Sequence, residues 1–184
     1  MSSTFKILLY YKYVPIEDPE ALKDAQKLLC QELGLKGRIL VSQEGINGTT
    51  AGEEKNVNKY MTITSAIPGL EDMEWKISWA HEQVFPKLRV VVRDEIVTLG
   101  IKRNGEDVSL ENKAEYIEPA ELRQLYEEEK EFLIIDARNL YEATIGKFKN
   151  AVVPPIDNFR DFPQFVETLA EYKDKEVITY CTGG

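Results

Sequence analysis

Cys181 is the residue of this chain best placed to do chemistry. It follows a largely apolar run, Glu176–Tyr180, that is typical of a buried β-strand, and it precedes Thr182, Gly183 and Gly184. In α/β folds, reactive groups lie at the carboxyl ends of strands. A glycine-rich turn lets successive backbone N–H groups converge on an anion, which favours a thiolate. We therefore predict that Cys181 is catalytic and that the backbone N–H groups of the three residues after it form an anion cradle.

Other arrangements of reactive residues are weak. His81 is the only histidine, and its place two residues after Trp79 is typical of a strand end at the surface. One histidine and two cysteines far apart in the sequence, Cys30 and Cys181, are too few for a tetrahedral zinc site. The sequence carries no flavin, haem or iron-binding signature either. We predict no metal ion, and no cofactor is evident.

Composition describes an ordinary globular protein. Of 184 residues, 43% are hydrophobic and 30% are charged. No apolar run approaches the roughly 20 residues that span a bilayer, and the first residues lack the basic and apolar stretches of a secretory signal. Two cysteines provide no disulfide framework. We therefore expect a cytoplasmic protein with no membrane association, and no protein partner is evident.

The net charge of −9 is spread unevenly along the chain. Residues 1–110 carry 14 Lys and Arg against 16 Asp and Glu, whereas residues 111–184 carry 9 against 16. Phosphate contacts need clustered cations, so the second half is a poor nucleic-acid surface. In the first half, Lys87, Arg89 and Arg93 share one face of a predicted strand. That face is either a solvated sheet surface or a set of possible RNA contacts.

The first hundred residues predict an α+β domain of the ferredoxin-like type. Leu22, Ala25, Leu29 and Leu33 recur at helical spacing, with Gly34 as the terminator. Asn47-Gly48 is a hairpin signal between two short apolar runs. The expected elements are strand 5–14, helix 20–33, strands 37–42 and 48–51, helix 53–66, and strands 74–80 and 87–98. The first six give the order β-α-β-β-α-β.

The rest of the chain predicts a second domain of α/β type. Residues 101–117 are polar and form the expected linker, so we place the domains at 1–100 and 118–184. A helix over 119–129, an apolar strand over 132–135, a helix over 165–172 and a strand over 176–180 alternate. Alternating strands and helices are typical of βαβ units, whose strands are parallel.

This second half resembles the rhodanese-like domain. The resemblance is carried by Asp136-Ala-Arg138 at the end of the first strand, by the stretch from Tyr141 to Ala151, and by Cys181 at the end of the last strand. In rhodaneses the cysteine at this position carries a persulfide. The resemblance also implies that Asp136 and Arg138 give structural support through hydrogen bonds and ion pairing.

A narrower resemblance covers nearly the whole chain. Gly45–Thr49, Glu95–Gly100, Asn158–Pro163 and Tyr180–Gly184 occur together and in the order found in the bacterial tRNA uridine hydroxylase family. That resemblance implies a ferredoxin-like (acylphosphatase-like) front domain and tRNA as the partner. It also implies oxygen-dependent hydroxylation of the wobble uridine to 5-hydroxyuridine, with molecular oxygen as co-substrate.

Two other functions remain open. A rhodanese-type sulfurtransferase would move sulfur through a persulfide on Cys181, and a non-catalytic rhodanese-like module would only bind a partner. The family also continues beyond Thr-Gly-Gly with an arginine, a second cysteine and a closing helix. We therefore expect the 184 residues to be a fragment or the ordered part of a longer product, with an incomplete rhodanese-like domain that is inactive by itself.

Overall fold

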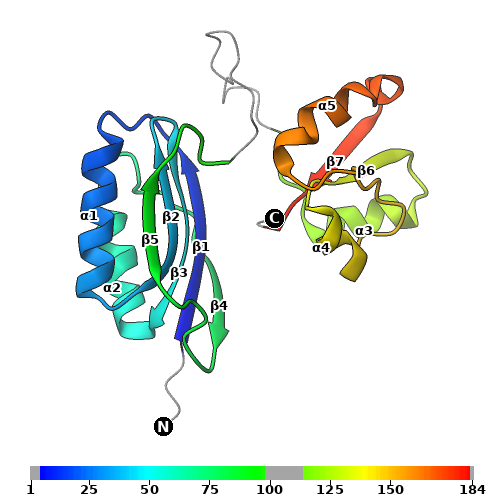
Figure 1. Cartoon of the computed structure of the whole chain (residues 1–184). Coiled ribbons are helices and arrows are strands. Elements are labelled where there is room, and N and C mark those ends of the chain that lie inside the picture. The colour runs from blue at the N-terminus through cyan, green and yellow to red at the C-terminus, as the bar shows by residue number, and fades with distance from the viewer. Residues whose placement is uncertain (1–4, 98–113, 183–184) are drawn as a thin grey trace. The chain divides into compact units, whose positions relative to one another are not determined.

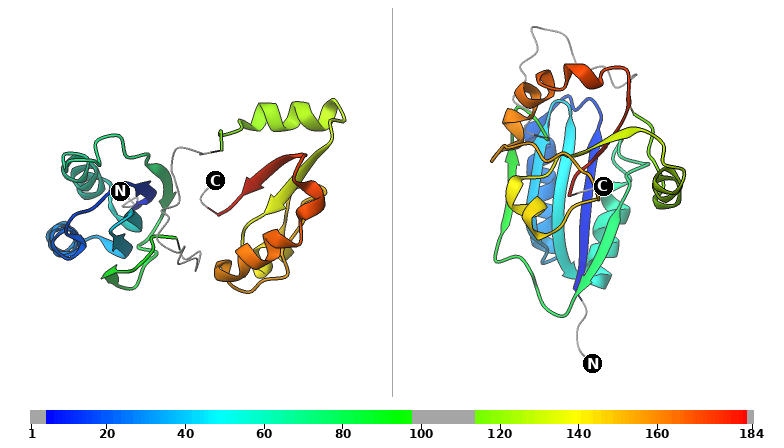
Figure 2. Two further views of the ribbon diagram at one scale, coloured as in Figure 1. Left: turned by 90° about the horizontal axis from the view of Figure 1, so that it is seen from above. Right: turned by 90° about the vertical axis from the view of Figure 1, so that its right-hand side faces the viewer.

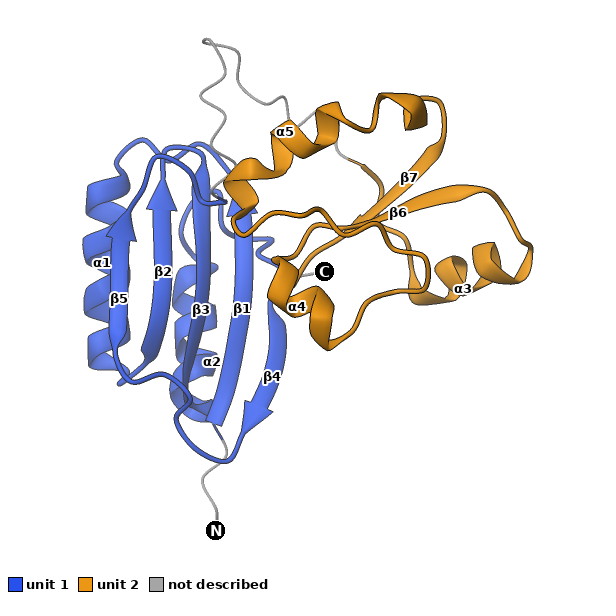
Figure 3. Cartoon of the chain, turned by 45° about the vertical axis from the view of Figure 1, so that its right-hand side comes forward, with its two compact units in different colours: residues 1–97 blue, residues 98–184 orange. Residues whose placement is uncertain are grey.

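The structure, a computed structural model, describes residues 5–97 and 114–182. The chain divides into two compact units, residues 1–97 and residues 98–184 (Figure 3). Most of the predicted linker, 101–117, lies outside the described residues.

Unit 1 is a single sheet with two helices. Its elements are β1 (Phe5–Tyr13), α1 (Pro19–Glu32), β2 (Lys36–Ser42), β3 (Gly45–Glu53), α2 (Glu54–Thr64), β4 (Lys76–Ala80) and β5 (Leu88–Val92). The strands lie in the order β4-β1-β3-β2-β5, and only the β2–β5 pair is parallel (Figure 1). The predicted order β-α-β-β-α-β is confirmed, and β5 extends the sheet beside β2.

The core of unit 1 lies between the sheet and the two helices. Alternate residues along the strands are fully buried beneath α1 and α2, among them Leu8, Ile39, Val41 and Ile46. The Asp18 side chain accepts a hydrogen bond of 2.9 Å from the Ala21 N–H and so caps the start of α1. Both helices lie on the same side of the sheet (Figure 3). The described residues of this unit place no helix on its other face.

The predicted hairpin turn at Asn47-Gly48 is wrong. The two-residue turn between β2 and β3 is Gln43–Glu44, and Asn47 and Gly48 lie inside β3. Gly48 faces the ring of Tyr10, where an added Cβ would lie 2.3 Å from ring atoms. The glycine therefore provides space for an aromatic ring on the neighbouring strand instead of a turn.

The strand predicted over residues 87–98 is shorter in the structure. Strand β5 ends at Val92, although the N–H of Arg93 still donates to the carbonyl oxygen of Val41. The chain then leaves the sheet. The N–H of Ile96 donates to the Glu44 carboxylate at 2.7 Å, and its carbonyl accepts from the Asn47 side chain at 2.8 Å. Ile96 is buried as a result.

Unit 2 is built on two parallel strands. Its elements are α3 (Pro119–Glu127), β6 (Phe132–Asp136), α4 (Leu140–Ile145), a 3-10 turn (Phe159–Asp161), α5 (Phe162–Glu167), a second 3-10 turn (Ala170–Tyr172) and β7 (Glu176–Tyr180). Strands β6 and β7 pair in parallel, as predicted. An isolated parallel bridge joins Ile135 to Val152. Helices α3 and α5 lie on opposite sides of the pair (Figure 2).

The helix predicted over residues 165–172 differs in detail. Helix α5 begins three residues earlier, with Pro163 in its first turn, and ends at Glu167. The chain tightens into a 3-10 turn at Ala170–Tyr172 before β7. In the described part of the chain, no helix is long and apolar enough to cross a membrane.

Candidate active site

The parallel pairing of β6 and β7 brings the predicted site residues to one edge of the sheet. Asp136, the last residue of β6, lies opposite Tyr180, the last residue of β7. The Ala137 N–H donates to the Tyr180 carbonyl at 2.9 Å, so the pairing of the two strands continues up to the residue before Cys181. Because parallel strands end at the same edge, Cys181 and Asp136 lie at neighbouring strand ends.

The two cysteines have opposite environments. Cys181 is exposed, whereas Cys30 is buried in the core of unit 1. Burial raises the pKa of the Cys30 thiol to about 12, so this thiol is protonated at neutral pH. Since the thiolate is the nucleophile, Cys30 is inert in the folded chain.

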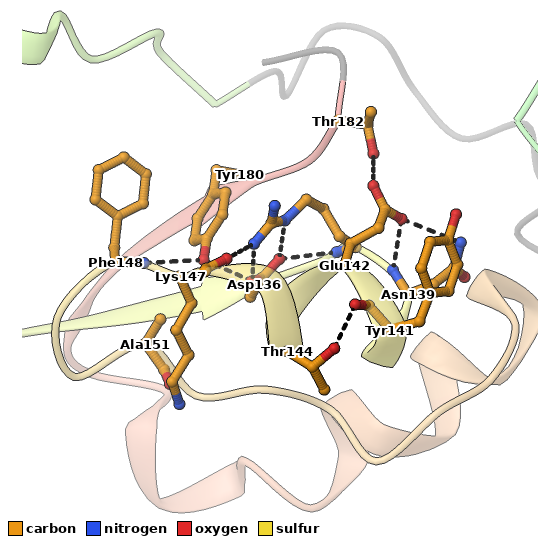
Figure 4. A network of polar contacts seen from close by, with 12 residues as sticks. Asp136, Asn139, Tyr141, Glu142, Thr144, Lys147, Phe148, Ala151, Tyr180 and Thr182 are labelled. Atoms are coloured by element: carbon orange, nitrogen blue, oxygen red, sulfur yellow. Dashed lines mark hydrogen bonds and ion pairs between the residues drawn. The ribbon is translucent and has the colours of Figure 1, made fainter.

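Asp136 and Arg138 form a two-pronged ion pair, and Figure 4 shows the polar contacts around Asp136. Arg138 donates from Nε to Oδ1 at 2.8 Å and from Nη2 to Oδ2 at 2.7 Å, and its backbone N–H donates to Oδ1 at 3.1 Å. The Asp136 side chain is completely buried, and 20% of the Arg138 side chain is exposed. Hydrogen bonding to the guanidinium holds the pKa of Asp136 below its usual range. The carboxylate is therefore charged, and both of its oxygens accept hydrogen bonds, which suits a structural role.

Tyr180 links this ion pair to the loop after α4. Its hydroxyl donates to Oδ2 of Asp136 at 2.6 Å and accepts from the Phe148 N–H at 3.3 Å. The Arg138 guanidinium lies over the Tyr180 ring, 5.2 Å from its centre, and the Phe148 ring meets that ring edge-on. Burial and then the hydrogen bond to Asp136 raise the pKa of Tyr180. The residue before Cys181 is thus fixed at both its backbone and its hydroxyl.

Thr182 has a side-chain contact that the sequence did not indicate. Its hydroxyl donates to Glu142 Oε1 at 2.6 Å. The other Glu142 oxygen accepts from the Asn139 backbone and side-chain nitrogens at 3.2 Å each, which closes the first turn of α4. The start of α4 therefore holds the residue that follows Cys181. Gly183 and Gly184, the rest of the predicted cradle, lie outside the described residues.

A shallow pocket of about 420 Å³ opens at this edge of the sheet. It is lined by Arg138, Gly146, Lys147, Phe148, Tyr180, Cys181 and Thr182. The Lys147 ammonium donates to the Ala151 carbonyl at 3.1 Å, and it is the second cation of the pocket. An exposed thiol beside two cations, with an aromatic wall, can hold an anionic or planar ligand next to sulfur.

Sequence reasoning identified Cys181, Thr182, Asp136 and Arg138, and the structure brings these four together in unit 2. It missed Glu142 and the linking role of Tyr180, because their partners lie 40 and 44 positions away in the sequence. It also missed Lys147, although the hydrogen bond of that side chain to the Ala151 carbonyl is local. The predicted RNA contacts Lys87, Arg89 and Arg93 are exposed residues of unit 1. Among residues 5–97 and 114–182, no three His, Cys, Asp or Glu side chains are grouped as metal ligands would be.

The first unit decides the family. Residues 5–96, half of the chain, match the family model described as the UPF0176 acylphosphatase like domain. The chain belongs to the UPF0176 family. This match also identifies the ferredoxin-like sheet of unit 1 as the acylphosphatase-like domain that the sequence predicted.

Curated relatives of this UPF0176 chain carry the name that the resemblance indicated. A Streptococcus thermophilus protein named tRNA uridine(34) hydroxylase is 43% identical over 188 residues, covering 100% of this chain and 57% of its own length. An Onion yellows phytoplasma protein of the same name is 41% identical over 184 residues, with 100% and 59% covered. The chain thus spans about three fifths of the relatives it matches. The predicted resemblance to the tRNA uridine hydroxylase family is confirmed.

Likeness to solved structures is weak by comparison. The structure titled "BlrB - a BLUF protein, dark state structure" matches 54% of this chain and 80% of that one, with 22% identity and a TM-score of 0.45. We draw no conclusion from it about the UPF0176 chain.

Proposed function

We propose that this chain is part of a cytoplasmic enzyme that hydroxylates the wobble uridine of tRNA to 5-hydroxyuridine, with Cys181 as its reactive thiol. The observation that carries the proposal is identity of 41–43% along the entire chain to proteins named tRNA uridine(34) hydroxylase. Molecular oxygen would be the co-substrate. Unit 1 would contribute contacts to RNA, and unit 2 would contribute the chemistry.

The geometry of unit 2 supports a rhodanese-like domain with a cysteine at the strand end. Two parallel strands have helices on both sides, and the exposed Cys181 follows the second strand. The buried Asp136–Arg138 pair and the Tyr180 hydroxyl fix the strand ends from which the loop leaves. A thiol held in this way acts as a nucleophile or carries sulfur, and the cations of the pocket favour anionic groups beside it.

A sulfurtransferase is the second candidate, and the same exposed Cys181 favours it. The thiol would accept sulfane sulfur from a donor as a persulfide and pass it to an acceptor thiol. A binding module without catalysis is the third candidate. All three place Cys181 in the same pocket, so they differ in what happens when the thiol is removed.

The test uses the full-length protein in a strain that lacks the gene. Nucleosides from its tRNA are measured by mass spectrometry after complementation with wild type, Cys181→Ala or Cys30→Ala. We expect wild type and Cys30→Ala to restore the nucleosides derived from 5-hydroxyuridine and Cys181→Ala to restore none. The Cys30 variant is the matched control, since it removes the buried thiol, and circular dichroism checks that it folds.

The other outcomes separate the candidates. Unchanged nucleosides in the deletion strain would overturn the hydroxylase proposal. A persulfide trapped on Cys181 together with unchanged nucleosides would support the sulfurtransferase. Full restoration by Cys181→Ala would overturn the part of the proposal that makes Cys181 the reactive thiol and would favour the binding module.

A further inference from the structure

The face of the unit 1 sheet that carries neither helix has a continuous cross-strand row of residues. Strand register places Lys76, Leu9, Thr49, Arg38 and Arg89 directly beside one another on β4, β1, β3, β2 and β5. We call this set the cross-strand row. Its residues point away from the helices, because their strand neighbours such as Leu8, Ile39 and Val90 belong to the core.

Two of its cations are available to a ligand. Arg38 and Arg89 are paired in register on adjacent strands, and both are exposed. Within residues 5–97 and 114–182, neither guanidinium forms an ion pair or a side-chain hydrogen bond with another residue. Adjacent strands lie about 4.8 Å apart, so two like charges are held side by side without a carboxylate between them. An anionic partner would relieve that repulsion.

Most charged strand residues of this face are basic, although Glu44 and Glu95 lie near enough to Tyr13 at one end to help raise its pKa. Among the strand residues that share it, the cations are Lys36, Arg38, Lys76 and Arg89, and the only acid is Glu53 at the edge of the face. The chain as a whole carries −9. A basic face on an acidic protein is a localised feature and cannot be ascribed to overall composition.

The face also has an apolar and aromatic part. Leu9 and Tyr11 are successive residues of β1 on this side, and both are half-buried. The Tyr11 ring meets the Tyr13 ring edge-on, with 6.5 Å between centres. Nucleic-acid bases stack on aromatic side chains presented by such sheets, while cations beside them hold the phosphates.

Two chain segments mark the limits of the face. At one end, the Gln83 side chain donates to the Ala51 carbonyl at 3.0 Å. At the other end, Ile96 is held over Asn47 by a hydrogen bond of 2.8 Å. Thr49 of the cross-strand row lies between these two contacts in the register of β3, two residues from Asn47 and two from Ala51.

We propose that this face binds a single strand of RNA, with phosphates on Arg38 and Arg89 and bases against Leu9 and Tyr11. The inference rests on the proposed function, from which it takes RNA as the substrate class, and it adds the surface and the residues. Single-stranded RNA fits better than a duplex, because only unpaired bases can stack on a sheet. It also fits better than a second copy of the chain, whose net charge is negative but whose matching face would be basic.

The test measures binding of a fluorescein-labelled, ten-nucleotide, uridine-rich RNA to this chain by fluorescence anisotropy at several salt concentrations. Each phosphate contact on a single strand contributes about 0.7 to the slope of log K against log salt. We therefore expect Arg38→Ala/Arg89→Ala to lower that slope by about 1.4 and to weaken binding about 25-fold at 0.1 M salt.

The matched control is Lys55→Ala/Lys59→Ala, which removes two exposed cations from α2. It should change affinity less than threefold. Tyr11→Ala should weaken binding at least about fivefold, and Tyr11→Phe should bind like wild type, because stacking needs the ring and not the hydroxyl. Circular dichroism confirms that each variant is folded.

Several results would overturn the inference. The first is a loss of RNA affinity in Lys55→Ala/Lys59→Ala as large as that in Arg38→Ala/Arg89→Ala. The second is a ten-base-pair duplex that binds as tightly as the single strand. The third is an Arg38→Ala/Arg89→Ala variant that keeps its RNA affinity but changes from dimer to monomer in sedimentation. The outcome is independent of the nucleoside assay, since RNA binding by this chain needs no turnover. Loss of the hydroxylase proposal would leave the binding result in place, and the reverse also holds.

Discussion

Replacing Arg138 with methionine tests whether the ion pair holds the strand ends of unit 2. The variant keeps the length and apolar stem of the side chain but removes the guanidinium. Three hydrogen bonds are lost, two to Asp136 at 2.7 and 2.8 Å and one to the Gly146 carbonyl at 2.7 Å. The Asp136 carboxylate stays behind with its side chain completely buried.

The expected cost follows from what Asp136 retains. Removing one partner of a buried ion pair costs about 3–5 kcal/mol. The Tyr180 hydroxyl at 2.6 Å and the backbone N–H of residue 138 at 3.1 Å remain as donors. Because 20% of the Arg138 side chain is exposed, water can also reach the carboxylate in the variant. We therefore expect a loss at the lower end, about 3 kcal/mol, or roughly 150-fold in the opening equilibrium.

Hydrogen exchange followed by mass spectrometry measures this loss where it occurs. The reporting amides are Asp136, which donates to the Val152 carbonyl at 2.9 Å, Ala137, which donates to Tyr180 at 2.9 Å, and Val152, which donates to Ile134 at 2.8 Å. They should exchange about 150-fold faster in Arg138→Met, because exchange reports the free energy of local opening. Both tryptophans, Trp75 and Trp79, belong to unit 1, so their fluorescence provides an internal control.

Arg123→Met is the matched substitution, since Arg123 is an exposed arginine of α3. It should leave the β6 and β7 amides as protected as in wild type, and Arg138→Lys should fall between, because lysine keeps the charge but not the fork. If Arg138→Met and Arg123→Met exchange alike at these amides, the ion pair does not stabilise the strand ends and the reasoning is refuted.

Three further predictions follow from how deeply particular tyrosine and cysteine side chains are buried. Tyr60→Phe removes the hydroxyl that donates to Gln26 at 2.5 Å and contacts the Tyr10 hydroxyl. The free energy of unfolding of unit 1 should therefore fall by about 1–3 kcal/mol, as measured by urea unfolding followed by tryptophan fluorescence. An unchanged midpoint would show that these buried hydroxyls add no stability. The free energy of unfolding of unit 1 should fall as pH rises from about 10 to 12. Burial raises the pKa of Tyr13 to about 12 in the folded chain, so between these pH values the phenol loses its proton more readily in the unfolded chain. Urea titrations that give the same free energy across this pH range would contradict the prediction. Iodoacetamide should label exposed Cys181 in the folded chain and buried Cys30 only in denaturant, as peptide mass mapping would detect, and early labelling of Cys30 would contradict its burial.

The fold of unit 1 was largely predictable because its signals are local. Apolar residues at helical spacing marked α1, and alternating strands and helices gave the order of elements. The turn was misplaced because Asn47-Gly48 satisfies a local turn rule, whereas the need for Gly48 comes from Tyr10, 38 positions earlier on a neighbouring strand. A short-range pattern cannot distinguish a glycine needed for backbone conformation from one needed for space.

The residues at the strand ends of the candidate site could be predicted from the sequence, but the side-chain hydrogen bonds that connect them could not. Asp136, Arg138 and Cys181 follow apolar runs, and parallel pairing brings such ends together. The hydrogen bonds from Tyr180 to Asp136 and from Thr182 to Glu142 depend on side-chain positions set by packing. Arg38 was missed for a similar reason, because its pairing with Arg89 joins strands separated by about fifty residues.

The position of β1 in the sheet has a consequence for the order of folding during synthesis. Among the strands of unit 1 this one is made first, yet its partners are β3 and β4, which end at Glu53 and Ala80. Its apolar residues therefore have no neighbours in the sheet until much of unit 1 has been made. Contacts between distant segments form slowly, since a long loop must close first. The nascent chain should thus expose an unpaired aromatic strand during most of the translation of unit 1, a stage at which chaperones would bind it.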